Sequence, residues 1–453
     1  MFTSINPATG SVVATHPALA AAEVETALAA AATAFARWRT EPVAARAALL
    51  GRLADAYAAN RERLARMATL EMGKTYASSL AEVDKCVAGF RFYASRGPAM
   101  LDPVVTRLAH GSAEVHWLPL GPVLAVMPWN FPYWQVVRFL APTLLAGNVG
   151  LLKHASNVQG VAGLIAEMMS VAGAPAGLFH NLAIPSAMVG AVIADPRVVA
   201  VTLTGSEAAG AAVAETAGRH LKKVVLELGG SDPFVVMPSA DLDAAVAAAV
   251  TARIQNSGQS CICGKRMIVD AGIYDGFVER FGAAMAAVTT GDPFDPATAM
   301  GPLSSREARD GVVAQLAAAQ AQGATLVGGV ALPGPGAFMS AGVLTDIPPG
   351  SPVLHEEIFG PVAILLRADG LDAAIALAND TPFGLGSSVW TADPSEQARF
   401  VRDIDAGMTA INQVLASVPD APFGGVKRSG HGRELGHAGL HEFMNLKTVL
   451  RAG

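Results

Sequence analysis

The sequence predicts an α/β protein in which helices cover parallel sheets. From about residue 115 onward, short apolar runs alternate with helix-like segments over short connections, the pattern of repeated strand–helix–strand units. The chain has 453 residues, too many for one ordinary core, so two or three domains are expected. Hydrophobic residues make up 52% of the chain and charged residues 15%, which excludes a disordered or fibrous protein.

The first hundred residues predict helices instead. Ala-rich stretches with charges at helical spacing cover residues 23–39, 44–68 and 82–95. We expect all three stretches to be helical. Before them, the turn-forming run from Asn6 to Gly10 is expected to join two short strands.

Two successive α/β units follow. The first is expected to contain strands at 123–126, 149–153, 179–182, 199–204 and 223–228, with helices at 131–145 and 158–172 and a third opened by Gly205 to Gly210. The second is expected to contain strands at 234–237, 266–269, 361–366 and 387–390, with helices from Asp241 to 256 and at 273–288, 306–322 and 371–379. The tail 442–450 predicts a strand detached from both units and exchanged between subunits.

Charge and composition exclude several kinds of partner. The net charge is −6 and no Lys/Arg-rich run of five or more residues occurs, so neither nucleic acid nor an anionic membrane surface is an expected partner. The uncharged stretches 115–137 and 168–194 are interrupted by prolines and asparagines, which argues against membrane spans. The start of the chain has no basic and then apolar pattern of a secretory signal. Three cysteines are too few for a disulfide framework, and a reducing cytoplasm is expected.

Two segments carry candidate catalytic groups. Cys261 follows a helix and Gly258 in NSGQSC, where a thiolate is able to attack a carbonyl, although an isolated cysteine is more often a small buried hydrophobe. Glu227 ends an apolar strand before two glycines in LELGG, at the sheet edge where ligands bind in open α/β folds. An ordinary surface carboxylate at a strand end explains Glu227 equally well when this segment is considered alone.

Two further segments carry polar groups beside aromatic rings. Asn130 lies in PWNFP, where rigid flanking residues would hold its amide toward a developing oxyanion, although a structural turn is the simpler explanation. In EEIFGP, Glu357 and Phe359 are placed to hold a ribose and to flank a ring, but the segment taken alone predicts only a turn before a strand.

Taken together and in order, these segments resemble the aldehyde dehydrogenase superfamily over nearly the whole chain. The matching signatures are PWNFP at 128–132, LELGG at 226–230, NSGQSC at 256–261, EEIFGP at 356–361 and PFGGVKRSG at 422–430. The resemblance implies two Rossmann-like three-layer α/β domains and a small β oligomerisation element. It divides the chain into a dinucleotide-binding domain (1–102 and 120–228), a catalytic domain (229–420) and bridging strands (103–119 and 432–453), assembled as a homodimer or homotetramer.

The resemblance also implies catalytic roles. Cys261 would attack the aldehyde and form a thiohemiacetal, while Asn130 and the backbone N–H of Cys261 form the oxyanion hole. Transfer of a hydride to a nicotinamide would leave a thioester. Glu227 would then act as general base for the water that hydrolyses the thioester.

The cofactor implied is NADP or NAD, and no metal ion is implied. The sequence lacks the usual G-x-G-x-x-G loop, but Gly205-x-x-x-x-Gly210 opens a helix whose N-terminus is able to receive a pyrophosphate. Lys153 and Glu357 would hold ribose hydroxyls. Strictly NAD-selective members often carry an acid at the position of Ser156, so we expect NADP to be tolerated here. The residues carried over for the cofactor are Trp129, Lys153, Ser156, Gly205, Ser206, Glu357 and Phe359.

The aldehyde is indicated by Arg138, eight residues after Asn130. Succinate-semialdehyde dehydrogenases carry an arginine there, and a guanidinium is able to grip a carboxylate through two hydrogen bonds. This sequence departs from some of those enzymes at Gln255, where they have a second arginine, and Ser417 is expected to supply the missing contact. The resemblance is closest to bacterial succinate-semialdehyde dehydrogenases.

Several alternatives stay open at this point. One alternative is an enzyme that accepts a broad range of aliphatic or aromatic aldehydes. Another is an enzyme that transfers the acyl group to coenzyme A, although Glu227 favours hydrolysis. A cysteine hydrolase and a non-catalytic binding protein are the remaining classes. Cys263 suggests a reversible disulfide with Cys261, but side chains two residues apart on an extended segment rarely reach bonding geometry.

Overall fold

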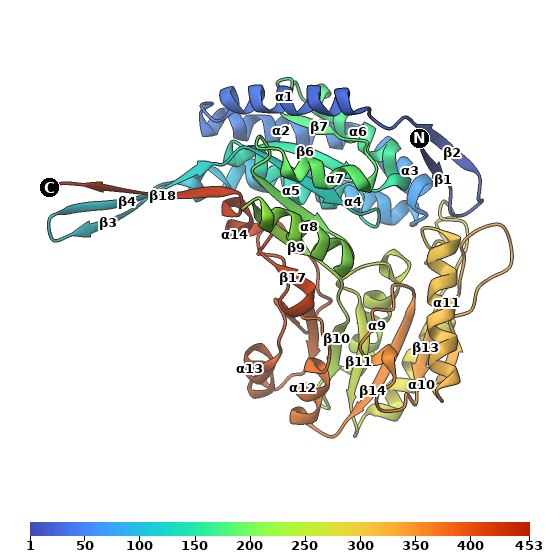
Figure 1. Cartoon of the computed structure of the whole chain (residues 1–453). Helices are drawn as coiled ribbons and strands as arrows, with labels where there is room; N and C mark the ends of the chain where they lie inside the picture. Colours follow the sequence, from blue (N-terminus) through green and yellow to red (C-terminus); the bar gives the residue numbers. More distant parts are fainter.

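The computed structural model describes residues 1–453 and contains four sheets (Figure 1). A six-stranded sheet has the order β17-β9-β8-β5-β6-β7 and a seven-stranded sheet the order β12-β13-β14-β11-β10-β15-β16. A three-stranded sheet, β18-β4-β3, projects from the body, and a small hairpin, β1 (Phe2–Ile5) and β2 (Val12–His16), lies near the N-terminus. The predicted α/β class is confirmed.

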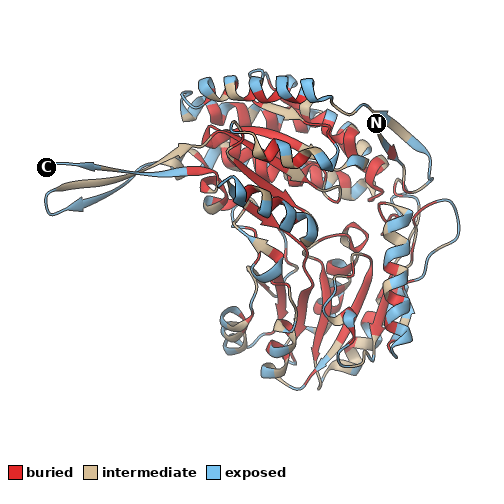
Figure 2. Ribbon diagram, in the orientation of Figure 1, coloured by how far each residue is buried: buried red, intermediate tan, exposed pale blue.

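The six-stranded sheet is parallel except at one edge. Its strands are β5 (Pro122–Met127), β6 (Val149–His154), β7 (Phe179–Asn181), β8 (Ala200–Thr204) and β9 (Lys223–Glu227), and the short β17 (Gly430–His431) pairs antiparallel with β9. The helices around it are α1 (Ala21–Trp38), α2 (Val43–Ala59), α3 (Arg61–Met72), α4 (Tyr76–Arg96), α5 (Trp134–Ala146), α6 (Gln159–Val171), α7 (Val189–Ala194) and α8 (Glu207–Arg219). The central strands β5, β6 and β8 are almost wholly buried (Figure 2).

Two predicted helices differ from the structure. The predicted helical stretch 44–68 is divided between two helices, because Asn60 separates α2 from α3 and its side-chain amide donates to the Ala56 carbonyl at 2.9 Å. The helix expected from residue 131 begins at Trp134 instead. Its first free N–H groups, those of Tyr133 and Trp134, both donate at 2.8 Å to the buried carboxylate of Glu82 on α4.

The seven-stranded sheet is parallel except for β12. Its strands are β10 (Asp232–Val236), β11 (Gly264–Asp270), β12 (Thr325–Gly328), β13 (Gly342–Thr345), β14 (Val362–Ala368), β15 (Gly386–Trp390) and β16 (Met408–Ile411). Its helices are α9 (Leu242–Ile254), α10 (Tyr274–Ala286), α11 (Arg306–Ala321), α12 (Leu371–Asn379) and α13 (Pro394–Asp403). Asp241 caps α9 as predicted, accepting from the N–H of Ala244 at 3.0 Å.

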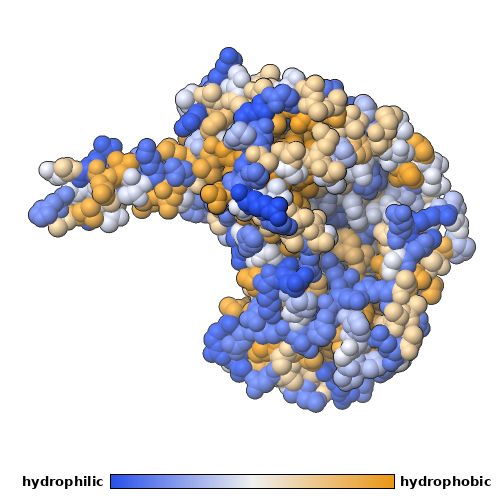
Figure 3. Space-filling view, viewed as in Figure 1, coloured by the Kyte–Doolittle hydropathy of each residue, from blue (hydrophilic) through white to orange (hydrophobic).

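The projecting sheet, here called the arm, consists of β3 (Val104–Leu108), β4 (Gly111–Pro119) and β18 (Met444–Arg451). β18 follows α14 (Gly436–His441) and pairs antiparallel with β4 from Met444↔Pro119 to Arg451↔Ser112. Hydrophobic side chains remain exposed along the arm, as the orange areas in Figure 3 show. They belong to Val104, Val105, Leu108, Leu446 and Leu450.

Nothing in the helices suggests a membrane span: none has both the length and the apolar character needed to cross a bilayer.

Candidate active site

The carboxyl ends of four neighbouring strands meet at one edge of the six-stranded sheet. In the order β9, β8, β5 and β6, these ends lead into Glu227, Gly205, Asn130 and Lys153. Ligands bind at this edge in open α/β sheets because the strand ends leave main-chain groups and loops free there. The structure thus gathers residues that are up to about a hundred positions apart in the sequence.

Cys261 reaches this edge through a tight turn in NSGQSC. Asn256, Ser257 and Gly258 have φ values of 54°, 56° and 75°, three successive left-handed residues after the end of α9. A Cβ at Gly258 would clash with the backbone of Gly360, so only glycine fits. Non-glycine residues in this conformation cost about 1–3 kcal/mol each, and such strain concentrates at functional sites. The turn fixes Cys261 by its backbone.

Two buried cations hold the turn, and neither was predicted. Lys265 donates to the carbonyls of Ser260 at 2.8 Å and Cys261 at 2.7 Å, and its Nζ lies 3.1 Å from Glu357. Arg253 donates to the Ile358 carbonyl at 2.9 Å and also reaches the carbonyls of Gly258 and Gly360. The segments NSGQSC and EEIFGP are therefore joined by charge-assisted hydrogen bonds to main-chain oxygens.

A cavity of about 310 Å³ opens beside Cys261. Aromatic rings flank it, since Trp129 and Phe359 meet edge to face with ring centroids 5.9 Å apart. Seven of the predicted residues line this cavity: Trp129, Asn130, Gly205, Ser206, Cys261, Glu357 and Phe359. Gln135, Thr204, Leu228 and Gly229, which were not predicted, complete it together with Pro128. The predicted Lys153, Ser156, Arg138, Ser417 and Glu227 do not line it.

The thiol of Cys261 is held by opposing electrostatic effects. Burial raises its pKa to about 12, while the positive charges of Arg138 and Lys265 act to lower the pKa. A thiol with this pKa carries little thiolate at neutral pH, so its activation requires a base or a bound electrophile. Cys263 is buried, its Sγ lies 3.7 Å from the carbonyl oxygen of Gln255, and neither cysteine forms a disulfide.

Asn130 presents its amide beside Cys261. Its Nδ2 donates to the Gln259 carbonyl at 3.0 Å, and its Oδ1 accepts from Gln135 Nε2 at 2.9 Å. One of the two Nδ2 hydrogens is therefore left for another acceptor. The backbone N–H of Cys261 makes no hydrogen bond within the protein. Both N–H groups are thus free to donate, and their joint role as an oxyanion hole stays a prediction.

Glu227 lies behind the cavity wall and is fully buried. A Cβ at Gly424 would come within 2.7 Å of its Oε1, so the carboxyl group packs against the PFGGVKRSG segment. Burial raises the pKa of Glu227 well above its usual range, and the nearby carboxylate of Glu434 adds to this. Neither oxygen has a hydrogen-bond partner in the protein. A buried carboxyl group left unpaired in this way is a functional-site signature.

The remaining cofactor candidates lie along the same edge. Ser206 caps α8, accepting from the N–H of Ala209 at 3.3 Å, so the other N-terminal N–H groups of α8 are available to a phosphate. Lys153 is half-buried at the end of β6, and burial lowers its pKa. Ser156 follows it, exposed. Glu357 accepts from the N–H of Gly230 at 3.3 Å.

Arg138 contacts two residues of the cavity wall, Gln135 and Thr204, but neither Arg138 nor Ser417 lines the cavity. Arg138 is buried and already paired with a carboxylate, that of Glu434. Its Nη2 also donates to Gln135 Oε1 at 3.2 Å and to Thr204 Oγ1 at 3.1 Å, which leaves Nη1 outside these contacts. Ser417 accepts from Lys85, a residue on α4 that was not predicted, at 2.7 Å.

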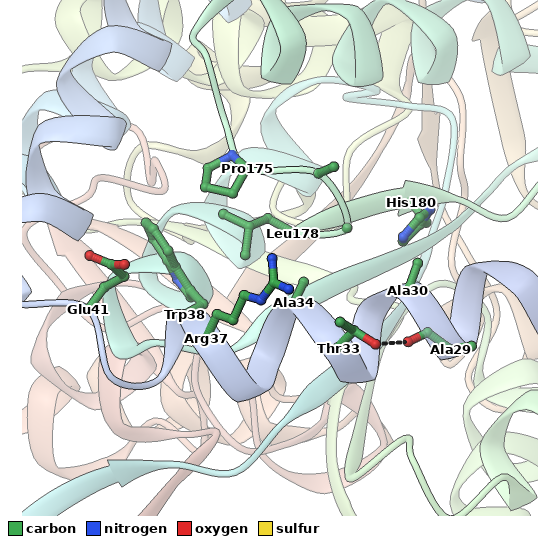
Figure 4. Close-up of a pocket in the computed structure, with 12 residues that line it drawn as sticks. Ala29, Ala30, Thr33, Ala34, Arg37, Trp38, Glu41, Pro175, Leu178 and His180 are labelled. Carbon is green, nitrogen blue, oxygen red and sulfur yellow. Dashed lines mark hydrogen bonds between the residues drawn. The ribbon is translucent and has the colours of Figure 1, made fainter.

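A larger hollow, about 570 Å³, lies elsewhere, between α1 and the segment 175–180 (Figure 4). Leu178 and Pro175 face α1 across it, and Trp38 lies toward one end. Small residues of α1 form much of its lining, and none of its residues lines the cavity at Cys261. We assign it no part in the chemistry.

An approachable cysteine beside an oxyanion-type donor pair, at the ligand-binding edge of a parallel sheet, defines an enzyme site. The family model described as "Aldehyde dehydrogenase family" matches residues 1–449. The chain belongs to the aldehyde dehydrogenase family, an oxidoreductase family, which confirms the predicted family and fold.

Individual relatives agree over the whole length. The chain is 52% identical to a succinate-semialdehyde dehydrogenase [NADP(+)] 1 of Mycobacterium tuberculosis (strain ATCC 25618 / H37Rv), covering 98% of each. It superimposes on a succinic semialdehyde dehydrogenase from Streptococcus pyogenes in complex with NADP+ with a TM-score of 0.98, 36% identity and 100% coverage of both chains. An NAD-dependent aldehyde dehydrogenase from Sinorhizobium meliloti gives 0.97 and 34%, covering 100% of this chain and 91% of that one.

Proposed function

We propose that this enzyme oxidises succinate semialdehyde to succinate and reduces NADP+ in the same reaction. The observation that carries the proposal is a pair of cations, Arg138 in contact with the cavity residue Gln135 and Lys85 in contact with Ser417, which would hold a carboxylate at the far end of an aldehyde bound to Cys261. The names and activities of the relatives at about half identity support the same substrate and cofactor.

Cys261 acts as the nucleophile in this proposal. Its sulfur loses its proton to solvent and, as the thiolate, attacks the aldehyde carbon, and the carbonyl oxygen becomes an oxyanion between Asn130 Nδ2 and the N–H of Cys261. NADP+ held by the residues at the sheet edge, such as Trp129, Glu357 and Phe359, would supply the two-electron oxidation that converts this adduct into a thioester.

Glu227 then serves as general base for hydrolysis. Water attacks the thioester carbon and gives its proton to the carboxylate, the carbon–sulfur bond breaks, and the acid and the thiol are released. Since burial raises the pKa of Glu227, the carboxylate form becomes more populated as pH rises, and hydrolysis should accelerate with it. Retention of Glu227 favours water over coenzyme A as the acyl acceptor.

The residues at the sheet edge fit a dinucleotide. The aromatic pair Trp129 and Phe359 flanks the cavity, and Glu357 and Lys153 are placed for ribose hydroxyls. The free N-terminus of α8, with Gly205 and Ser206, suits a pyrophosphate. Ser156 brings no carboxylate to repel a 2′-phosphate, so NADP is the expected cofactor and NAD a second one.

Arg138 and Ser417 remain the proposed contacts for the distal carboxylate. The pairing of Arg138 with Glu434 limits Arg138 to its Nη1 group unless that ion pair opens. A different tail on the aldehyde, aliphatic or aromatic, is the second candidate. It is favoured only by the largely apolar surroundings of the cavity, such as Leu228 and Phe359.

A substrate panel tests this function. The rate of cofactor reduction is measured with succinate semialdehyde, pentanal and benzaldehyde, each with NADP+ and with NAD+. Pentanal matches the length of succinate semialdehyde and lacks its charge. We expect kcat/KM for succinate semialdehyde with NADP+ to exceed that for pentanal by about 100-fold, the value of two or so charge-assisted hydrogen bonds. A preference for pentanal or benzaldehyde, or an NAD preference above about 100-fold, would contradict the proposal.

We also propose that the arm is the oligomerisation element of a homodimer or homotetramer, as its exposed apolar side chains suggest. In the division of labour that goes with it, residues 1–102 and 120–228 bind the dinucleotide and 229–420 carry the nucleophile. Three free thiols suit a cytoplasmic enzyme.

A further inference from the structure

Three side chains from distant parts of the chain make a compact contact beyond the cavity. Lys85 Nζ donates to Ser417 Oγ at 2.7 Å, and Trp134 Nε1 donates to the same oxygen at 2.9 Å. Lys85 Nζ also lies 4.6 Å from the centroid of the Trp134 ring. We call Lys85, Trp134, Arg138 and Ser417 the distal cluster.

The distal cluster lies next to the reacting centre along α5. Trp134 and Arg138 are one helical turn apart on this helix, and Gln135 lies between them in sequence. Gln135 donates to Asn130 at 2.9 Å, accepts from Arg138 at 3.2 Å and lines the cavity with Cys261. The side chain of Gln135 therefore connects the proposed oxyanion donor to Arg138 of the distal cluster.

Lys85 differs from the other cations nearby because it has no carboxylate partner. The charge of Arg138 is balanced by Glu434, and that of Lys74 is balanced by Glu82. The polar contact of Lys85 is a neutral hydroxyl and its other close neighbour is an indole ring. An uncompensated cation in a partly buried position is costly, so a site that keeps one is suited to an anion.

The hydrogen-bond inventory of the distal cluster leaves donors for that anion. Ser417 Oγ accepts from both Lys85 and Trp134, so its own hydroxyl hydrogen is available to a further acceptor. The ammonium group of Lys85 carries three hydrogens and donates one of them to Ser417. The side chain is only half-buried, so the group is not sealed from a ligand.

We propose that Lys85 is the principal anchor for the distal carboxylate of the substrate, with Ser417 as its hydrogen-bonding partner. Arg138, neutralised by Glu434, then shapes the local field and makes at most one contact through Nη1. This inference rests on the proposed function, and it assigns the charge selectivity of that function to a residue on α4.

The titration of Lys85 supports this role. Burial, and then the positive charge of Arg138 on α5, lower the pKa of Lys85 to about 8, with Lys74 acting in the same sense and Cys86 and Glu82 in the opposite sense. The ammonium form therefore prevails below pH 8 and is lost above it. A bound carboxylate stabilises the ammonium form, so the affinity for an anionic substrate should fall as pH rises through about 8.

The test compares Lys85→Met with the wild type, using succinate semialdehyde and pentanal. Methionine keeps the unbranched shape and removes the charge. We expect the ratio of kcat/KM for succinate semialdehyde to that for pentanal to fall about 10- to 100-fold, since a hydrogen-bonded charge is lost. The inhibition constant of succinate, the product, should rise by a similar factor. Arg91→Met is the matched control, because Arg91 is an exposed cation on the same helix with one surface ion pair.

The pH dependence separates binding from a structural role. The wild-type ratio should decline above pH 8, and the Lys85→Met ratio should stay flat. The ionisations of Cys261 and Glu227 affect kcat/KM for both aldehydes equally. Their effect therefore cancels in the ratio of kcat/KM for succinate semialdehyde to that for pentanal. Thermal unfolding of both variants checks that the fold is kept.

The outcomes distinguish this inference from the proposed function. If the wild type prefers succinate semialdehyde and Lys85→Met keeps that ratio and the succinate inhibition constant, Lys85 is not the anchor while the function stands. If the wild type itself shows no preference for succinate semialdehyde, the function fails, and the inference fails with it. If the Lys85→Met protein is destabilised, the same measurements are made on Lys85→Gln, for which the same ratios are expected.

Discussion

The cavity at Cys261 and the distal cluster are built in different ways. The cavity takes its shape from main-chain turns at adjacent strand ends, with Lys265 and Arg253 holding carbonyl oxygens. The distal cluster is made of side chains from α4, α5 and the segment before Pro422, and Lys85 and Ser417 are 332 positions apart. In the proposed function, the chemical step thus depends on groups held by the backbone, whereas the choice of aldehyde depends on side chains. The aldehyde preference is therefore free to change without a change in the chemical step.

The largest effect expected from this division follows Cys261→Ser. A serine hydroxyl is a far weaker nucleophile, so kcat/KM should fall about 10⁴-fold or more. The loss should be equal for succinate semialdehyde and pentanal, because both react at the same backbone-held atom. Cofactor reduction at high enzyme concentration measures it.

The matched control for that change is Cys263→Ser, because Cys263 is buried two residues away and does not line the cavity. Activity within about tenfold of wild type is expected. A loss that differed between the two aldehydes in Cys261→Ser would break the division drawn above.

The next effect is that of Glu227→Gln. Without a general base, hydrolysis of the thioester should slow by about 10²- to 10⁴-fold. Hydride transfer is kept in part, so a burst of reduced cofactor should precede a slow steady state, and mass spectrometry should find the acyl group on Cys261. The rise of the steady-state rate with pH, which follows from the raised pKa of Glu227, should vanish in the variant. Absence of a trapped acyl-enzyme would contradict the assigned base.

The smallest expected effect concerns cofactor preference and the residue Ser156, which follows β6 at the ligand-binding edge of the six-stranded sheet. Ser156→Glu brings a carboxylate to an exposed position after β6, where it should repel a 2′-phosphate and accept from a ribose hydroxyl. The ratio of kcat/KM for NADP+ to that for NAD+ should fall by about 10- to 100-fold. The ratio for succinate semialdehyde over pentanal should not move. A change in aldehyde preference would show that cofactor and substrate selection are coupled.

The same division explains what could be predicted from the sequence. Cys261, Glu227 and Asn130 each lie in a short contiguous segment whose sequence determines the local backbone conformation. The parallel strands then bring these segments to one edge of the six-stranded sheet. Lys85 lies within α4, next to other charged residues in the sequence. A lysine in such a segment is typical of the solvent-exposed face of a helix. Only the fold reveals that Ser417 is its partner, and Glu434 and Lys265 escaped prediction for the same reason.

The fold shows a similar limit. Apolar runs predicted most of the parallel strands but not β13 and β16, because a fully buried strand is a run of apolar residues and these two are short. The break between α2 and α3 was missed because Asn60 is tolerated inside helices, and its local hydrogen bond to Ala56 decides the outcome. α13 and β16 were missed because they are short and bury few side chains.

The strand β17 has a consequence for how the enzyme is made. Gly430 and His431 cover β9 along Glu227 and Leu226, and a Cβ at Gly430 would clash with the Leu226 carbonyl. During synthesis the chain grows by about 5–20 residues per second, so β9 is complete long before its neighbour leaves the ribosome. Until then the nascent protein has an open strand edge, able to pair with other chains, beside an unfinished site. Translation of the segment that contains β17 therefore closes this sheet edge next to Glu227.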